Sequence, residues 1–111
     1  MDVGDYRAHD ALGLAALIRS GEVSREEVLA AACAGIEADN PALGAVVRTR
    51  FERAAEEARA LDAGAPFAGV PTLTKDLLMA IGGEPLAFGS AAMAEWRAPE
   101  DSSLVRRVRE A

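Results

Sequence analysis

The sequence predicts an α/β protein that is mostly helical and carries two short strands. Four segments space their apolar residues at helical intervals, and most of them follow a residue that caps helices well. Two short stretches, at 45–47 and 72–78, are instead β-branched or alternate apolar with polar residues. We expect one partial domain over residues 1–111, with a thin core because alanine dominates the hydrophobic residues.

A helical hairpin is expected over residues 10–39. Asp10 is a good N-cap for the apolar stripe that follows it. Ser24 is followed three residues later by Glu27, and this spacing predicts a capping box at the start of the second helix. The dipeptide Asn40–Pro41 is expected to end that helix, because proline lacks the backbone N–H that a helix needs.

The remaining elements follow in chain order. Over residues 45–63 the sequence predicts a short strand and then a helix with one apolar face and one charged face. Residues 72–78 predict a strand that carries the lysine of the chain. A terminal helix over 102–111, capped by Asp101 or Ser102, has about two turns and an apolar face that no later residue covers. We therefore expect the chain to be part of a longer protein.

Composition excludes several classes of function. The formal charge of −6 argues against non-specific nucleic-acid binding, which needs a basic surface. The acidic N-terminus does not resemble a signal peptide, and no apolar run is long enough for a membrane helix, so a cytoplasmic location is expected. Cys33 and His9 are each the only residue of their type, which argues against a disulfide or a zinc site. No metal or organic cofactor is expected.

Lys75 is the chain's only lysine, whereas there are eleven arginines. Arginine stays protonated in proteins, but a lysine amine can become neutral and act as a base. In an extended strand Lys75 shares a face with Leu73 and Leu77, while Asp76 points the other way. This apolar setting favours a neutral amine that could activate a hydroxyl. The alternative is a lysine at a strand end that reaches into solvent.

Several stretches together resemble the amidase signature family. The block APFAGVPTLTKD at 65–76 resembles the opening of that family's catalytic region, and 14–29 is similar to its first helical hairpin. The stretch NPALGAVV at 40–47, the Gly-Ser pair at 89–90 and the Asp-Ser motif in 101–107 match further motifs in the same order. The resemblance covers nearly the whole chain. Departures at Gly44, Thr72 and Thr74 affect local packing.

The resemblance implies the N-terminal part of an α/β/α sandwich around a mixed sheet. It also implies an amidase with a Ser–cis-Ser–Lys triad, in which Lys75 matches the lysine and a small carboxamide is cleaved through an acyl-enzyme. Both serines of the triad belong to a Gly/Ser-rich signature expected after Ala111, so the 111 residues alone are expected to be inactive. The serines that are present fit helix ends or turns: Ser20, Ser24, Ser90, Ser102 and Ser103.

Two other functions stay open at the level of sequence. One is the subunit of a glutamine-dependent aminoacyl-tRNA amidotransferase that releases ammonia from glutamine and works with companion subunits. The other is a non-catalytic remnant or docking module. Neither a membrane nor a nucleic acid is expected as a direct partner, whereas the remainder of the amidase domain or a homo-oligomer partner is. Four large side chains either line a substrate pocket or pack against the fold: Met79, Phe88, Met93 and Trp96.

Overall fold

The computed structural model describes residues 1–61 and 64–111. They separate into two compact units, Met1–Pro71 and Thr72–Ala111. The last two residues of the strand and helix predicted over 45–63 lie outside the described residues. That the chain forms one partial domain stays a prediction.

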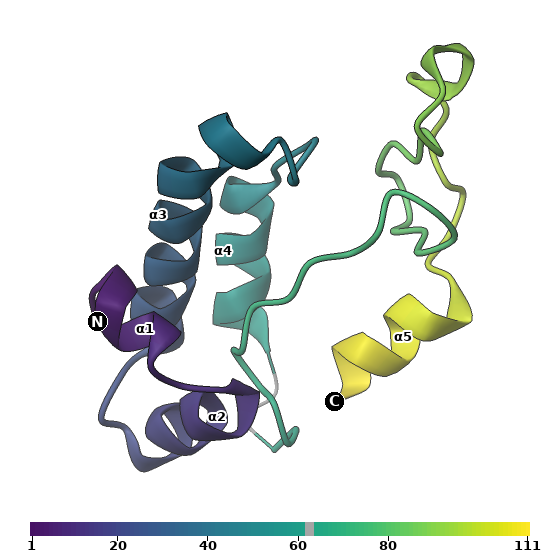
Figure 1. The fold of residues 1–111 in the computed structure, drawn as a ribbon. Helices are drawn as coiled ribbons and strands as arrows, with labels where there is room; N and C mark the ends of the chain where they lie inside the picture. Colours follow the sequence, from purple (N-terminus) through teal and green to yellow (C-terminus); the bar gives the residue numbers. More distant parts are fainter. Residues whose placement is uncertain (62–63) are drawn as a thin grey trace. The chain divides into compact units, whose positions relative to one another are not determined.

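The longest helix of the first unit is α3 (Arg25–Leu43), shown in Figure 1. It begins at the capping box that the sequence predicts. The Glu27 N–H donates to Ser24 Oγ at 3.1 Å, and the Ser24 N–H donates to Glu27 Oε2 at 2.8 Å. Gly44 ends the helix in the left-handed region, with φ of 61°.

The end of α3 differs from the prediction in two ways. The helix continues past Asn40–Pro41, because a proline in the last turn removes only one helical hydrogen bond. The Asn40 side chain then binds both backbone groups of Val46, with Nδ2 donating to the carbonyl and Oδ1 accepting the N–H, each at 2.8 Å. The described residues contain no strand, and the one expected at 45–47 is not confirmed, because Asn40 occupies the groups that would form its ladder.

Two shorter helices precede α3. The sequence did not predict α1 (Val3–Arg7), a single turn that begins at Asp2 and packs against α3. It escaped prediction because its capping box uses two aspartates and precedes no apolar run. α2 (Ala11–Ser20) begins at Asp10, as predicted, and ends at Gly21 with φ of 76°.

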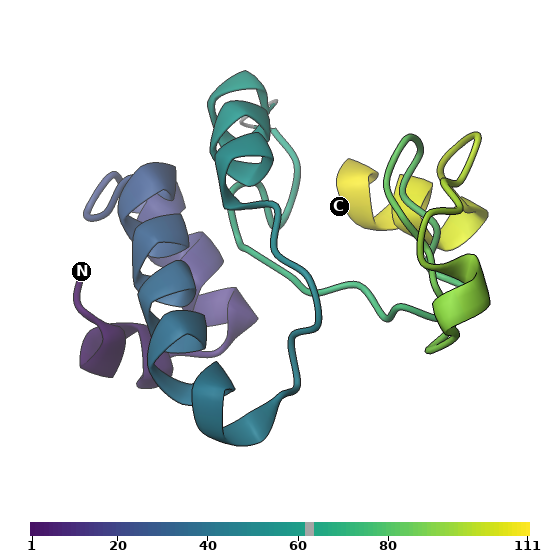
Figure 2. The ribbon, with the colours of Figure 1, turned by 90° about the horizontal axis from the view of Figure 1, so that it is seen from above.

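α4 (Phe51–Ala60) packs against α3 in the first unit (Figure 1 and Figure 2). Arg50, just before the helix, forms two hydrogen bonds with the Glu57 carboxylate, at 2.8 and 2.9 Å. Val28 of α3 is fully buried, whereas the one buried residue of α4 is Ala58, which is 7% exposed. The core is thin and rich in alanine, as expected. Its buried side chains are Leu14, Ala15, Val28, Ala31, Ala32 and Ala58.

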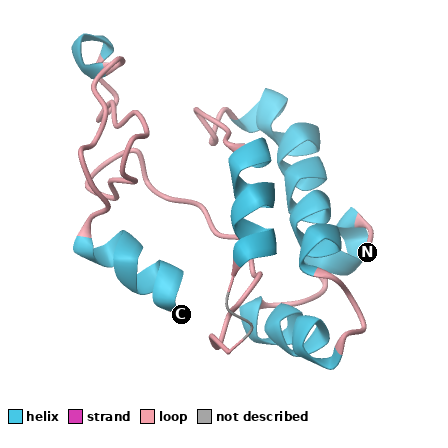
Figure 3. Cartoon of the chain, turned by 180° about the vertical axis from the view of Figure 1, so that it is seen from behind, coloured by secondary structure: helices cyan, strands magenta, loops and turns pink. Residues whose placement is uncertain are grey.

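The second unit consists mainly of turns and loops (Figure 3). Its helical segments are the short 3-10 turn η1 (Ala91–Met93) and α5 (Ser103–Glu110). Ser102 caps α5 as predicted, since its Oγ accepts the Val105 N–H at 3.3 Å. The strand expected at 72–78 is not confirmed. The segment ends in a turn, and the φ of 67° at Leu78 is incompatible with extended backbone.

Candidate functional site

Lys75 lies immediately before the turn formed by residues 76–78. Its side chain is exposed, and so are Leu73 (63%) and Leu77 (46%). The Lys75 backbone N–H donates to Met79 Sδ at 3.3 Å. The part of the chain that the structure describes therefore does not provide the apolar burial expected around the amine. The reason is that the turn replaces the strand on which that expectation rested.

The Asp76 carboxylate holds this turn in place. Asp76 Oδ1 accepts the N–H of Ala87, which is buried, at 2.9 Å. Leu78, at the end of the turn, has a φ of 67°, and Phe88, next to Ala87, has a φ of 53°. Residues with a Cβ rarely adopt positive φ, and such strain persists only where the surroundings impose it. Apart from the position of Asp76 beside the lysine, nothing in the sequence indicated this contact.

Residues 83–98 fold back on themselves. The Leu86 N–H donates to the Trp96 carbonyl at 3.1 Å, and the rings of Phe88 and Trp96 have centroids 6.4 Å apart. Phe88 is 40% exposed and Trp96 is 42% exposed. This aromatic pair forms part of the surface of the unit and not of its core, which contains Leu86, Ala87, Ala98 and Val105.

Asp101 connects α5 to the loop that follows the Lys75 turn. Its Oδ1 accepts the Gly82 N–H at 2.7 Å, and its Oδ2 pairs with Arg109 Nε at 2.9 Å. Arg106 Nη1 donates to the Asp101 carbonyl at 2.7 Å. Both arginines of α5 are exposed, and they reach back to the carboxylate and the carbonyl that Asp101 offers at the start of the helix.

Every serine considered as a nucleophile lies at a helix end, as predicted. Ser24 caps α3, Ser102 caps α5, and Ser90 precedes η1. The Ser20 hydroxyl donates to the Leu17 carbonyl at 3.0 Å. The Ser103 hydroxyl accepts a hydrogen bond from Arg106. These local contacts account for Ser20, Ser24, Ser102 and Ser103 without a catalytic role, whereas Ser90 makes no side-chain capping bond to η1.

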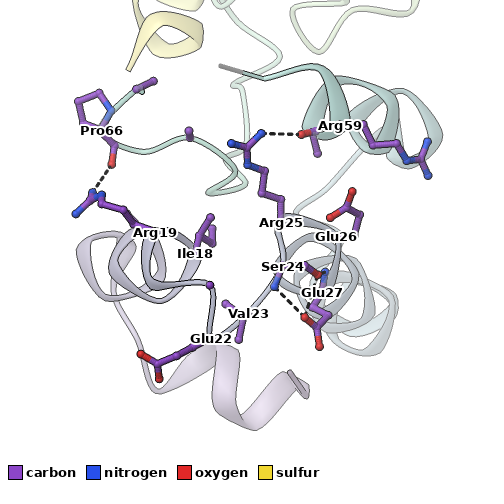
Figure 4. Close-up of a pocket in the computed structure, with 15 residues that line it drawn as sticks. Ile18, Arg19, Glu22, Val23, Ser24, Arg25, Glu26, Glu27, Arg59 and Pro66 are labelled. Carbon is purple, nitrogen blue, oxygen red and sulfur yellow. Dashed lines mark hydrogen bonds between the residues drawn. The ribbon is translucent and has the colours of Figure 1, made fainter. Parts of the chain in front are cut away.

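The first unit contains an open groove of about 620 Å³, between the turn that joins α2 to α3, the end of α4, and residues 65–68. Its arginines serve the fold. Arg25 Nη1 donates to the Leu61 carbonyl at 3.0 Å. It also donates to the Ala58 carbonyl at 3.4 Å, and Arg19 Nη2 donates to the Pro66 carbonyl at 3.1 Å (Figure 4). These contacts fasten the loop that leaves the helical unit.

The remaining reactive side chains are sparse. Burial raises the pKa of the Cys33 thiol, and the Glu37 carboxylate raises it further. Such a thiol is a weak nucleophile, in line with the role of a small hydrophobic residue. Among the described residues, no three side chains of the metal-binding types gather into a cluster. Within the same residues, no helix has the length and apolar character needed to cross a bilayer.

The chain belongs to the amidase family. The family model described as Amidase matches residues 27–111, well over half of the chain. The matched region contains Lys75, Asp76 and Asp101. The resemblance noted in the sequence is thereby confirmed.

Several curated relatives are similar to nearly the whole chain. The 6-aminohexanoate-cyclic-dimer hydrolase of Pseudomonas sp. (strain NK87) is 42% identical over 104 residues, which are 92% of this chain and 21% of the relative. The lipoamidase of Enterococcus faecalis is 39% identical over 108 residues, 96% of this chain and 15% of the relative. A glutamyl-tRNA(Gln) amidotransferase subunit of Salinispora arenicola is 39% identical over 114 residues, 96% of this chain and 23% of the relative.

The chain spans about a fifth of the length of the curated relatives it matches. Their names place it in a family of enzymes that act on carbon–nitrogen bonds other than peptide bonds.

Solved structures agree with this assignment. A structure of 6-aminohexanoate cyclic dimer hydrolase matches all of this chain with a TM-score of 0.88 and 39% identity, over 22% of its own length. A structure of that hydrolase complexed with substrate matches 93% of this chain with a TM-score of 0.87 and 41% identity, over 21% of its length. The fold is therefore that of a helix-rich region of an amidase-signature hydrolase.

Proposed function

We propose that these residues are the N-terminal portion of an amidase that cleaves a small carboxamide through an acyl-enzyme, with a Ser–cis-Ser–Lys triad. The observation that carries the proposal is Lys75. It is the chain's only lysine, it lies in the region matched by the family model, and its side chain is exposed. The two serines would come from the remainder of an α/β/α amidase domain, since the serines described above serve helix ends.

In this mechanism the neutral Lys75 amine accepts a proton from the middle serine, which in turn accepts one from the nucleophilic serine. The nucleophilic oxygen attacks the amide carbon, and backbone N–H groups stabilise the negative charge on the carbonyl oxygen. The amine leaves with a proton that Lys75 returns through the middle serine. Water then attacks the acyl-enzyme by the same route and releases the carboxylic acid. None of these steps requires a metal or an organic cofactor.

The neighbours of Lys75 support its assignment as the base. Leu73, Leu77 and Leu78 are all exposed in this chain. In the complete enzyme, apolar residues of the remaining domain would cover them and exclude water from the amine. Lysine becomes neutral most readily in such a setting.

The first substrate to test is the cyclic dimer of 6-aminohexanoate, because two similar relatives and both matching structures carry its name.

A second candidate is the ammonia-releasing subunit of a glutamine-dependent aminoacyl-tRNA amidotransferase. Its support is the 39% identity over 114 residues to an amidotransferase subunit of this kind. This candidate predicts that the protein needs companion subunits and releases ammonia from glutamine. An amidase would cleave a simple carboxamide without them.

The first test is to read the coding DNA beyond Ala111 and express the whole reading frame. We expect a Gly/Ser-rich segment downstream and hydrolysis of a carboxamide by the complete protein. Lys75→Ala and Lys75→Arg should each lower kcat/KM by about 10²–10⁴-fold, because neither side chain can accept the proton. Arg107→Ala, which removes another exposed cation from the second unit, should keep the parent rate.

Two results would contradict the proposal. One is parent activity in Lys75→Arg, and the other is a stop codon directly after Ala111, which favours the remnant or docking module. The isolated 111 residues should show no turnover, and a serine-reactive phosphonate should not label them.

A further inference from the structure

We propose that Asp76 is a positioning residue for Lys75, acting through its hydrogen bond to the Ala87 N–H. This inference rests on the proposed function, because it assigns Asp76 a role in placing the catalytic base. All the groups involved belong to the second unit.

The hydrogen bond joins the lysine turn to the buried core of that unit. Asp76 Oδ1 lies 2.9 Å from the Ala87 nitrogen, eleven residues away in the sequence. Ala87 is 8% exposed and Leu86 is 5% exposed. A bond from a backbone N–H to a carboxylate is stronger than one between neutral groups, and it gains further when one partner is buried.

Backbone strain surrounds this bond on both sides. Leu78 lies two residues after Asp76, and Phe88 follows Ala87 directly. Both residues have positive φ, 67° and 53°, although neither is glycine. Such conformations are energetically unfavourable and persist only where neighbouring contacts impose them. The Asp76–Ala87 bond links the two segments that hold these strained positions.

The bond constrains the backbone next to Lys75 and does not involve the exposed Lys75 side chain. Lys75 precedes Asp76, and its own N–H donates to Met79 Sδ at 3.3 Å across the turn. Fixing both ends of the turn fixes the point from which the long lysine side chain extends. Displacing a catalytic group by about 1 Å can lower the rate by about 10²-fold, so this anchorage matters to a base.

The carboxylate could instead act through its charge, by favouring the protonated ammonium. An amide distinguishes the two roles. Asp76→Asn retains an oxygen that can accept the Ala87 N–H but removes the negative charge. A positioning role predicts that asparagine rescues activity, whereas a charge role predicts a pH–rate profile that shifts as much in asparagine as in alanine.

The experiment compares Asp76→Ala, Asp76→Asn, Asp101→Ala and Lys75→Ala in the complete enzyme. Asp101 is the matched control, because its carboxylate also accepts a backbone N–H in the same unit, from Gly82 at 2.7 Å. Each variant is tested for kcat, KM, the pH dependence of kcat/KM and thermal unfolding. Hydrogen exchange of the peptide that contains Ala87 reports the bond itself.

We expect Asp76→Ala to lower kcat by about 10²-fold with little change in KM, and to speed exchange at Ala87. Asp76→Asn should restore most of the parent kcat and most of the protection of the Ala87 N–H against exchange. Asp101→Ala should destabilise the protein yet retain the parent kcat.

Equal losses of kcat in Asp76→Ala and Asp101→Ala would overturn the inference, since both would then be structural. So would parent kcat in Asp76→Ala while Lys75→Ala is inactive. Parent activity in Lys75→Ala itself would instead refute the proposed function.

Discussion

The two units of the chain are built by different means. Met1–Pro71 consists mainly of helices whose ends are set by caps a few residues away, and it buries Val28 completely. Thr72–Ala111 is mostly loop, and the carboxylates of Asp76 and Asp101 bind backbone N–H groups distant in the sequence. The second unit also exposes large apolar side chains: Leu73, Leu77, Leu78, Phe88, Trp96, Leu104 and Val108.

This difference matches the division of roles proposed above, in which the first unit is a scaffold and the second unit carries Lys75. Helices with satisfied ends are stabilised mainly by packing their apolar faces against one another, as α3 packs with α1 and α4. Loops held by a few side-chain hydrogen bonds can place a reactive group such as Lys75 in strained surroundings. We therefore expect substitutions in the first unit to change the stability of the protein, and Lys75 substitutions to change activity while leaving stability within about 0.5 kcal/mol.

The largest effect on stability is expected at Gly69 in the first unit. Its φ is 92°, and a Cβ there would lie 2.4 Å from Arg25 Cγ. Gly69→Ala should lower the free energy of unfolding by roughly 2–3 kcal/mol, from backbone strain and from displacing the arginine that binds the end of α4. Gly83, in the second unit, has a φ of 78°, but a Cβ added there would meet no atom within 4 Å. Gly83→Ala should therefore show only the loss of stability that comes from backbone strain. Urea unfolding checks the difference, and equal losses would show that the Arg25 contact is unimportant.

A smaller effect is expected from Val28→Ala. Val28 is 0% exposed, so the substitution removes two buried methyl groups and leaves a cavity. We expect a loss of about 2 kcal/mol in thermal unfolding. Val47→Ala is the matched control, because Val47 is 71% exposed and should change stability by less than about 0.5 kcal/mol. Equal melting temperatures for the two variants would show that Val28 of α3 does not contribute to the core of its unit.

The smallest effect concerns pH and Glu27. The Ser24 backbone N–H, and next the Ser24 hydroxyl, lower the pKa of the Glu27 carboxyl, with a further contribution from the N-terminal ammonium. Because the folded pKa lies below the unfolded value, this stabilisation is present above the unfolded pKa. It is lost as the pH falls through the folded pKa.

Unfolding measured across the acid range checks this pH dependence. Glu27→Gln should lose less stability than the parent on acidification. Ser24→Ala, which keeps the backbone N–H, should lie between the two. Identical acid slopes in all three proteins would show that the capping box carries no pH dependence.

Local spacing was enough to predict most helices. Asp10, Ser24 and Ser102 begin helices as expected, because a cap and the N–H that it accepts lie three residues apart. The strands at 45–47 and 72–78 were not confirmed, since a strand depends on a partner that local sequence does not identify.

The sequence by itself determined where α2, α3 and α5 begin and that the chain has one lysine, Lys75. It also determined the family, through motifs spread along the chain. Only the tertiary structure decided that Asn40 binds Val46 and that Asp76 binds Ala87. The physical reason is that such bonds form only when the intervening loop closes, and the free energy of closure depends on packing elsewhere in the chain.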